Sequence, residues 1–401
     1  ADWEVKRLGE LGNFSKGRGI LKDQVKDRGL PCIRYGEIYT SYDYVTHEFK
    51  SFIDEEVAKE SKEIKKGDVL FAGSGETVDE IGKSVAYIGE QTAYAGGDVI
   101  VFTPNQDLVS SDSLSYTLDI DIIRKQKRYM GQGNSVVHIY PSDLAKIQIP
   151  LPPLPEQQRI AEVLSTWDQA IQCTEQLILQ KEQRKKWLMQ KLLTGKIRLK
   201  GFSGEWKEMK IGDTGIIPQK TAITKIENHK LLTVRLHTKG IEFNERDKPI
   251  LSKTGRPYYE RYKGEILIGR QNIHNGGIGL ITEEFDGHIC SNAITSFIVT
   301  RNCTTEYLLY YLQYPRYYQM IENYMGGTGQ KELSEKQFLE IPIRLPNTIE
   351  EQTAIAEVLQ TADKEIELLK AKAEKLKEQK KGLMQQLLTG RMRLNLITIN
   401  K

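Results

Sequence analysis

The fold of this chain is decided by the stretch Glu156-Gln157-Gln158-Arg159-Ile160-Ala161-Glu162-Val163-Leu164. A second copy begins 195 positions later with Glu351-Gln352-Thr353-Ala354-Ile355-Ala356-Glu357-Val358-Leu359. The same offset holds without a gap to the ends of both copies, Leu192-Leu193-Thr194-Gly195 and Leu387-Leu388-Thr389-Gly390. An internal repeat of this kind determines the architecture and has to be recognised before any fold is proposed.

Each copy predicts a long helix. Pro155 suits the first helical position, where its missing N–H costs nothing, and the charge of Glu156 is favourable near a helix start. Gly195 and Gly390 follow the last apolar pairs, where a left-handed residue commonly ends a helix. At about 1.5 Å per residue, roughly 38 residues make a rod of about 57 Å.

Apolar residues recur in both copies at alternating steps of four and three, which is typical of a coiled-coil seam. The seam runs through Ile160, Leu164, Trp167, Ile171, Thr174, Ile178, Lys181, Lys185, Leu188 and Leu192 in the first copy, and through Ile355, Leu359, Ala362, Ile366, Leu369, Ala373, Leu376, Lys380, Leu383 and Leu387 in the second. Because lysines interrupt both seams, a uniform parallel zipper is disfavoured. Since roughly 150 residues separate the rods, they can lie antiparallel.

The rest of the chain forms two globular parts, which gives the order globule, rod, globule, rod. We expect an α+β protein with domains at 1–153 and 201–346, separated by long helical regions at 154–200 and 347–401 that form an antiparallel coiled coil with a pseudo-twofold repeat. In the first globule, Gly-rich turns separate strand-like runs at 31–35, 68–71, 84–88 and 98–102, and one helix is expected from Ser113 to Tyr129. The second globule repeats this outline loosely, from Trp206 onward as from Trp3.

Composition narrows the class of protein. The 401 residues carry a formal net charge of only +3, and residues 1–155 are acidic on balance, so charge alone does not indicate a nucleic-acid binder. No apolar run is long enough to span a membrane, and the N-terminus shows no signal-peptide pattern. The four cysteines lie far apart without a CxxC motif, which argues against zinc and against a disulfide framework. We expect a reducing, cytoplasmic setting.

Rods that repeat without a gap and carry divergent globules suggest a constant assembly surface presenting two different readers. A rigid spacer suits a linear polymer of fixed repeat such as duplex DNA. Two reading heads about one helical turn apart, roughly 34–36 Å, can address the same groove face. A rod of about 57 Å, less the overlap with each globule, can supply that separation.

The doubled pattern resembles the specificity subunit of type I restriction–modification enzymes. The resemblance rests on Leu151-Pro152-Pro153-Leu154-Pro155-Glu156, its partner at 345–356, the paired Leu-Leu-Thr-Gly ends and the starts at Trp3 and Trp206, and it covers essentially the whole chain. It implies two target-recognition domains that each read half of a split, asymmetric DNA site. It also implies helices that set the gap and dock two modification subunits. S-adenosylmethionine, ATP and Mg would then belong to the modification and restriction subunits. One departure is Asn347-Thr348-Ile349-Glu350, which replaces the prolines at the expected start of the second helix.

Catalytic alternatives fail on spacing. The double proline Pro152-Pro153 is flanked by leucines, unlike the motif of an amino-methyltransferase. Gly82-Lys83-Ser84 has the tail of a P-loop, but Gly75 lies too far upstream, so a turn before the strand at 85–88 is the better interpretation. The six histidines form no ligand pair that would hold a metal. We therefore expect no catalysis and no bound cofactor or metal in this chain.

Candidate DNA contacts are the base-reading and phosphate-binding residue types that cluster at Gly-rich loops. They are Lys16, Arg18, Arg34, Gln132 and Asn134 in the first globule, and Lys220, Arg235, Lys239, Arg270, Gln271, Asn272, Thr328, Gln330 and Lys331 in the second. The tyrosines between 307 and 324 follow a helical spacing, which favours a packing face over base stacking. The basic runs 184–186 and 380–381 could touch phosphates, although solvated helix charge is the simpler interpretation.

Two other functions stay open on the sequence. The chain could be a protein-only scaffold whose globules bind partners and never DNA, in which case its complexes would show no sequence preference and no steep salt dependence. It could also be a stand-alone DNA enzyme with dispersed catalytic acids, which methyl transfer or cleavage by the pure chain would establish.

Overall fold

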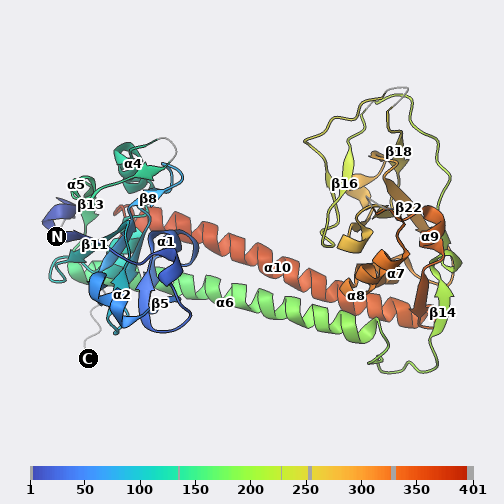
Figure 1. Ribbon diagram of the computed structural model, residues 1–401, viewed down its shortest axis with the longest axis horizontal. Coiled ribbons are helices and arrows are strands. Elements are labelled where there is room, and N and C mark those ends of the chain that lie inside the picture. The colour runs from blue at the N-terminus through green and yellow to red at the C-terminus, as the bar shows by residue number, and fades with distance from the viewer. Residues whose placement is uncertain (1–2, 134–135, 227, 252–254, 327–330, 395–401) are drawn as a thin grey trace. The chain divides into compact units, whose positions relative to one another are not determined.

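The computed structural model of the chain describes residues 3–133, 136–226, 228–251, 255–326 and 331–394. It divides into two compact units, the first made of Ala1–Glu175 with Ala371–Lys401 and the second of Gln176–Lys370. The two long helices, α6 (Leu154–Leu192) and α10 (Ile349–Leu387), contribute residues to both units (Figure 1). Each compact unit therefore combines one globular part with a segment of each helix, whereas the expected domain boundaries between globules and rods stay a prediction.

The two long helices occupy the predicted repeats, and each is 39 residues long. Helix α6 begins one residue earlier than expected, so Pro155 is its second residue. Helix α10 has no such proline. Instead the Thr348 hydroxyl accepts a hydrogen bond from the Glu351 N–H at 3.3 Å, which satisfies a donor at the helix start. Both helices are followed by a glycine with left-handed backbone, Gly195 at φ 67° and Gly390 at φ 72°.

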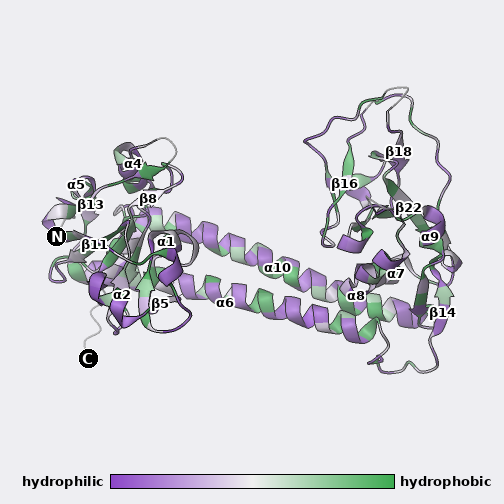
Figure 2. Ribbon diagram, viewed as in Figure 1, coloured by the Kyte–Doolittle hydropathy of each residue, from purple (hydrophilic) through white to green (hydrophobic). Residues whose placement is uncertain are grey.

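Within each unit the two helix segments run in opposite directions, as their ion pairs show. These pairs are Asp168–Lys380 and Glu175–Lys377 in the first unit, and Glu182–Lys370 and Lys185–Asp363 in the second. In both units, the paired residue on α10 has a lower residue number as the residue number on α6 increases. Figure 2 shows that both helices are largely hydrophilic, with hydrophobic positions interspersed along them.

The first unit contains two main sheets. Its strands are β1 (Glu4–Arg7), β2 (Gly12–Lys16), β3 (Leu30–Ile33), β4 (Val45–Thr46), β5 (Ser51–Ile53), β6 (Lys62–Ile64), β7 (Val69–Ala72), β8 (Ser74–Gly75), β9 (Ser84–Tyr87), β10 (Ala93–Ala95), β11 (Val99–Pro104), β12 (Val137–His138) and β13 (Gln148–Leu151). One sheet has the order β2-β11-β7-β9-β4 and the other β5-β3-β10-β6, while β1 pairs with β13 and β8 with β12. The predicted strand runs at 31–35, 68–71, 84–88 and 98–102 are confirmed as β3, β7, β9 and β11.

The second unit repeats this strand order. Its strands are β14 (Lys207–Lys210), β15 (Gly215–Ile216), β16 (Leu232–Val234), β17 (Ile241–Phe243), β18 (Tyr258–Arg261), β19 (Ile266–Gly269), β20 (Ile278–Leu280), β21 (His288–Ser291), β22 (Ile294–Val299) and β23 (Pro342–Leu345). The order β15-β22-β19-β20 matches β2-β11-β7-β9, and the pair β14-β23 matches β1-β13. The other sheet is reduced to the pairs β16-β17 and β18-β21, joined by one parallel bridge between Leu231 and Ile289.

The short helices lie in the globular parts. They are α1 (Tyr35–Thr40), α2 (Glu55–Glu60), α3 (Ser111–Thr117), α4 (Asp121–Met130) and α5 (Pro141–Leu144) in the first unit, and α7 (Thr305–Gln313), α8 (Pro315–Met320) and α9 (Glu335–Leu339) in the second. The prediction of one helix from Ser113 to Tyr129 is wrong, because the chain breaks between α3 and α4. There Leu118 and Ile120 are fully buried and Asp119 accepts a hydrogen bond from Tyr44 at 2.9 Å.

The core of each unit lies between its central sheet and the helices. Strand β7 is buried along its whole length, as expected for a continuous apolar run, and most of β19 is buried in the same way. The ends of the long helices join these cores, with Leu164 and Leu387 in the first unit and Leu192 and Leu359 in the second. The tyrosines of α7 and α8 are mostly buried, as a packing face requires.

Candidate nucleic-acid interface

The residue after strand β7 lies where three loops of the first unit meet. The Gly73 N–H donates to the Asp98 carbonyl at 2.7 Å, and the Gly73 carbonyl accepts from the Ile139 N–H at 2.9 Å. A Cβ at Gly73 would lie 2.9 Å from the Asp98 carbonyl oxygen, so only glycine fits there without a shift. Beside it, Gln132 and His138 exchange two backbone hydrogen bonds of 2.9 and 2.7 Å. We call Gly73, Asp98 and Ile139 the first frame.

The second unit repeats these contacts after strand β19. The Arg270 N–H donates to the Ala293 carbonyl at 3.1 Å, and the Arg270 carbonyl accepts from the Leu333 N–H at 3.0 Å. Gly326 and Glu332 exchange backbone hydrogen bonds of 3.2 and 3.0 Å, as Gln132 and His138 do. We call Arg270, Ala293 and Leu333 the second frame. The backbone arrangement is the same in both units, whereas the side chains attached to it differ.

Two predicted DNA contacts of the first unit lie in the loop that follows β2. Lys16 is exposed at the end of that strand, and its Nζ lies 5.3 Å from the centre of the Tyr140 ring. Arg18 is also exposed, and its N–H donates to the Ala95 carbonyl at 3.2 Å. Because Ala95 ends β10 just before the turn that contains Asp98, both cations belong to the loops around the first frame.

Arg34 and Gln132 approach the first frame from other segments. Arg34 is half-buried before α1, and its Nε lies 3.8 Å from the Glu37 carboxylate. The residue before Arg34, Ile33, accepts a hydrogen bond from the Gly96 N–H at 2.9 Å, which holds this segment next to the turn at 97–98. The exposed Gln132 begins the loop that His138 closes. The structure thus brings four predicted contacts of the first unit to one end of its sheet. Three further predicted contacts, Asn134, Thr328 and Gln330, lie outside the described residues.

In the second unit, Arg235 and Lys239 lie at the tip of the β16–β17 hairpin. Both are exposed, and Arg235 forms an ion pair with Glu242 at 3.0 Å. The tip is fixed to the turn after the second frame, because the N–H groups at 237–238 donate to the carbonyls at 275–276 at 2.8 and 2.9 Å. Positions 237–238 both have left-handed backbone, at φ 58° and 55°. Two cations are therefore held beside the second frame.

The predicted contacts at 270–272 belong to the second frame and the turn that follows it. An Arg270 nitrogen lies 2.5 Å from the Glu332 carboxylate, so part of this guanidinium is already used in an ion pair. Lys331, the residue before Glu332, is exposed and forms an ion pair with Glu322 at 2.7 Å. Predicted contacts at 270–272 and at 331, which are far apart in the sequence, thus meet at one end of the sheet.

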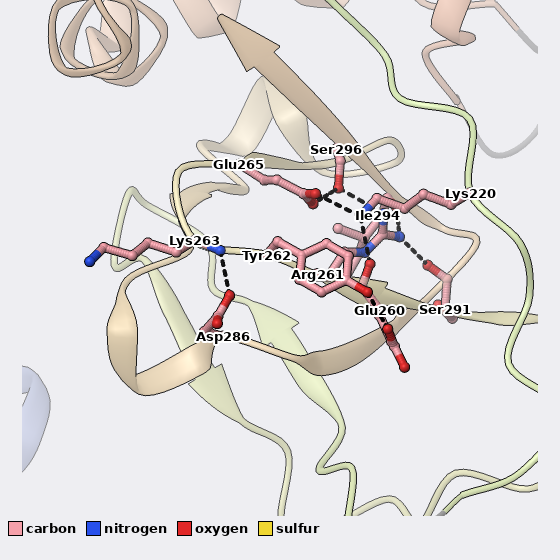
Figure 3. A network of polar contacts seen from close by, with 10 residues as sticks. All are labelled: Lys220, Glu260, Arg261, Tyr262, Lys263, Glu265, Asp286, Ser291, Ile294 and Ser296. Atoms are coloured by element: carbon pink, nitrogen blue, oxygen red, sulfur yellow. Dashed lines mark hydrogen bonds and ion pairs between the residues drawn. The ribbon is translucent and has the colours of Figure 1, made fainter.

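Lys220 belongs to an internal network instead of this surface (Figure 3). Its side chain is 12% exposed, and its Nζ donates to the Glu265 carboxylate at 2.6 Å and to the Glu260 carbonyl at 2.7 Å. Arg261 donates to the Ser296 hydroxyl at 2.7 Å in the same network, and Ser296 donates to Glu265 at 2.5 Å. The ammonium of Lys220 is bound inside the domain, so the structure gives no support to its predicted role as a DNA contact.

The attachment of each globule to the long helices was not predicted from the sequence. In the first unit Lys380 pairs with Asp168, whose carboxylate also accepts a hydrogen bond from the Tyr116 hydroxyl at 2.6 Å. The ammonium lies 3.9 Å from the centre of the Tyr44 ring. Burial lowers the pKa of Lys380, while burial and the Asp168 carboxylate raise the pKa of Tyr116.

The second unit repeats this cluster with the same residue types. Lys185 pairs with Asp363, which accepts a hydrogen bond from the Tyr310 hydroxyl at 2.7 Å. Lys185 and Lys380 are therefore buried or half-buried ion-pair partners, and their interpretation as solvated helix charge is wrong. The signal was present in the sequence, because the aspartates and the lysines recur with the offset of the repeat.

The repeated starts of the two copies form a further pair of contacts. In the first unit the buried Glu156 carboxylate accepts from Arg393 at 2.6 and 2.7 Å and from the Trp3 indole N–H at 3.1 Å. In the second, the equally buried Glu351 accepts from Arg198 at 2.5 and 2.6 Å. Each globule is therefore joined to the start of one helix and to the residues after the end of the other.

The glutamine next to each of these glutamates binds the backbone of a globule. Gln157 accepts from the Ser110 N–H at 2.9 Å, and Gln352 accepts from the Thr304 N–H at 3.0 Å. We use the name helix-docking contacts for three sets of contacts that occur in both units. They are these glutamine contacts, the contacts of the buried glutamates Glu156 and Glu351, and the Lys–Asp–Tyr clusters around Asp168 and Asp363. They explain why the two stretches share a Glu-Gln pair, since both side chains are used in the same way in each unit.

The predicted seam residues face inward within their units. All of them are buried or half-buried, including the three lysines. The most deeply buried are Ile160, Leu164, Leu192, Ile355, Leu359 and Leu387. Trp167, Ile178, Leu188, Leu369, Leu376 and Leu383 are half-buried, and Ile171 and Ile366 are buried.

Two features of the described ranges bear on metal binding and on thiol chemistry. No group of three or more His, Cys, Asp or Glu side chains there could hold a metal ion. Burial raises the pKa of Cys32 and Cys303 to about 12 and that of Cys290 to about 11, so these thiols are poor nucleophiles near neutral pH. Across the part of the chain that the structure covers, no helix is both long enough and apolar enough to cross a membrane.

Comparison with known proteins gives consistent matches. Residues 1–183 and 203–378 match the family model described as the type I restriction modification DNA specificity domain. The chain is 25% identical over 422 residues to the type I restriction enzyme MjaVIII specificity subunit of Methanocaldococcus jannaschii, with 98% of this chain and 93% of that protein covered. Its fold is similar to that of a crystal structure of the type I restriction–modification S subunit from M. genitalium, with a TM-score of 0.60, 15% identity and 96% of each chain covered. A structure of the type I R-M system described for its complex assembly matches with a TM-score of 0.60 and 17% identity over 98% of each chain.

Proposed function

Because the chain belongs to the family of type I restriction modification DNA specificity domains, we propose that it is the DNA specificity subunit of a type I restriction–modification system. Each unit reads one half of a bipartite, asymmetric site in duplex DNA. The observation that carries the proposal is the contrast between the helix-docking contacts and the frames. The docking contacts recur with the same residue types in both units, whereas the frames share a backbone and differ in their side chains.

The two long helices act as the spacer between the two reading heads. We propose that α6 and α10 form an antiparallel coiled coil over their length, which the opposite directions of their segments within each unit support. A helix of 39 residues is about 58 Å long. A stiff element of this length suits two readers that address duplex DNA about one helical turn apart, roughly 34–36 Å.

The helix pair also docks two modification subunits, and restriction subunits join the assembly. Exposed apolar side chains on the helix segments of the second unit support a protein-binding surface, among them Leu179 (51% exposed), Trp187 (48%) and Leu368 (71%). Methyl transfer and cleavage then belong to the partners, which carry S-adenosylmethionine, ATP and Mg. Those reactions act on genomic DNA, so the complex works in the cytoplasm.

The test is selection from random duplex DNA by this chain purified with its modification subunit. We expect two short defined half-sites around a gap of fixed length in which no base is preferred. Enrichment of one contiguous site would contradict two readers, and no enrichment, together with weak salt dependence, would favour a protein-only scaffold. Methylation or cleavage by the pure chain would instead establish a stand-alone enzyme.

A further inference from the structure

The two units carry different side chains at the three residues that follow the central strand, the first of which belongs to the frame. In the first unit these residues are Gly73, Ser74 and Gly75, and all three are buried. A Cβ at Gly75 would lie 2.7 Å from the Tyr39 hydroxyl, and the Ser74 hydroxyl lies 2.8 Å from His138 Nδ1. This segment has no side chain available to reach a ligand.

The equivalent segment of the second unit is Arg270-Gln271-Asn272, and it presents larger polar side chains. Asn272 is exposed, and its backbone is fixed on both sides. Its N–H donates to the Gly269 carbonyl at 2.9 Å, and its carbonyl accepts from the N–H groups of Asn275 and Gly277 at 3.0 and 2.9 Å. The side chain therefore projects from a rigid turn, which lowers the entropy lost when it binds a partner.

The Asn272 side chain is not used to stabilise the turn. Asn272 precedes a short 3-10 helix at Ile273–Asn275, a position where asparagine usually caps the helix with its side-chain oxygen. In this turn the side chain makes no cap hydrogen bond. An exposed amide on a rigid turn, not needed for capping, has the features of a recognition group.

The surroundings indicate the kind of ligand. The exposed Lys239 lies on the hairpin tip whose N–H groups at 237–238 bind the carbonyls at 275–276, so a cation is fixed beside the turn. Duplex DNA offers two kinds of group close together: phosphates, which bind cations, and base edges, which form hydrogen bonds with amides. A cation beside an amide can bind both. Among the bases, adenine offers the N7 acceptor and N6 donor that one asparagine side chain can satisfy together.

We propose that Asn272 reads an adenine in the half-site of the second unit and that Lys239 holds a neighbouring phosphate. The assignment rests on the proposed function and deepens it, since it names the base class and the residue. It also implies that the first unit reads its half-site from other loops, because Gly73-Ser74-Gly75 cannot play this part.

The experiment compares Asn272→Ala with Asn347→Ala, each purified in complex with the modification subunit. Asn347 is an exposed asparagine of the same unit in the segment before α10, so it serves as a matched control. Both variants are tested on two DNA libraries. In the first library one half-site keeps the sequence selected by wild type and the other is randomised, and in the second library the two half-sites are exchanged. We expect Asn272→Ala to lose roughly tenfold or more of the preference for adenine at one position of one half-site. The other half-site and the gap stay unchanged, and Asn347→Ala behaves like wild type.

Lys239→Ala gives a second, different readout. Loss of a phosphate contact weakens binding about equally for every sequence and lowers the slope of log affinity against log salt by about one. An unchanged adenine preference in Asn272→Ala would overturn the assignment, as would an equal loss of both half-sites. Failure of the wild-type complex to select a bipartite site would instead overturn the proposed function, so the two failures are distinguishable.

Discussion

At the scale of single residues, the lysines that interrupt the helix seams find partners that periodicity does not indicate. Lys380 has a side chain only 5% exposed and lies between the Asp168 carboxylate and the Tyr44 ring. A buried ion pair is weak evidence for net stability, because removing both charges from water costs about as much as their attraction returns. Breaking the pair, however, leaves one charge without its partner.

We therefore predict that Lys380→Met lowers the free energy of unfolding by about 2 kcal/mol. The value lies below the range for fully buried pairs because Asp168 is 33% exposed. Denaturant unfolding measures the change, and the exposed neighbour Lys381→Met should stay within about 0.5 kcal/mol of wild type. Combining Lys380→Met with Asp168→Asn should recover part of the loss. Equal unfolding midpoints for the two lysine variants would contradict the prediction.

A second buried lysine predicts a dependence on pH. Lys127 is 4% exposed and its Nζ donates to the Gly82 carbonyl at 2.9 Å. Burial lowers its pKa from 10.5 to about 8. Between those two values the unfolded chain binds more protons at this site than the folded chain, so the site favours folding increasingly as pH rises.

The measurement is the unfolding free energy of wild type relative to Lys127→Met from pH 7 to 10. We expect the unfolding free energy of wild type to rise relative to that of the variant above about pH 8, by at most about 1.4 kcal/mol per pH unit. Taking the difference removes the contribution of tyrosines and cysteines that titrate in the same range. The exposed Lys125→Met on the same helix serves as the control variant, and a flat difference between wild type and Lys127→Met would contradict the lowered pKa of Lys127.

At the scale of elements, the ends of the long helices depend on glycine. Gly390 has φ 72°, and a Cβ there would lie 3.5 Å from the Trp3 ring. Gly382 lies inside α10, where a Cβ would meet nothing within 4 Å. The glycine inside α10 and the glycine that follows the helix are therefore under opposite constraints.

Gly390→Ala should destabilise the protein by about 1–2 kcal/mol, because a residue with a Cβ strains in left-handed backbone. Gly382→Ala should stabilise it by up to about 1 kcal/mol, because alanine is the better helix former. Thermal unfolding of the two variants provides the comparison. A stabilising Gly390→Ala would mean that the turn after α10 is not fixed as described.

The long helices and the central strands could be predicted from the sequence because their signals are local. The four-and-three spacing indicated α6 and α10, and apolar runs indicated β7 and β11. The break between α3 and α4 was missed because the burial of Leu118 and Ile120 depends on the rest of the core. The first frame was missed for a similar reason, since its hydrogen bonds join residues 73, 98 and 139. Lys220 was predicted to contact DNA only because lysine is a phosphate-binding residue type. Its burial depends on the folded structure and cannot be recognised from the residue type.

At the scale of the whole molecule, the proposed spacer makes a prediction about the DNA site. Deleting residues 173–179 and 369–375 removes one heptad from each helix, so the seam periodicity is kept. The deletions lie between the pairs Asp168–Lys380 and Lys185–Asp363, which remain in place. The rods become shorter by about 10 Å.

Selection with the modification subunit should then return the same two half-sites with a gap about three base pairs shorter, at about 3.4 Å per base pair. Deleting only one of the two heptads places unequal lengths opposite each other and should reduce recovery of a bipartite site. An unchanged gap after the paired deletion would show that the helices do not set the distance.

The helix-docking contacts have a consequence for the order in which the chain can fold. The first unit needs Lys380 and Arg393, which come from the end of the chain, whereas the second unit is contained within residues 176–370. A ribosome delivers residues from the N-terminus at about 5–20 per second, so the second unit has all of its parts while the first still lacks its last helix segment. The globule that is synthesised first is therefore completed last.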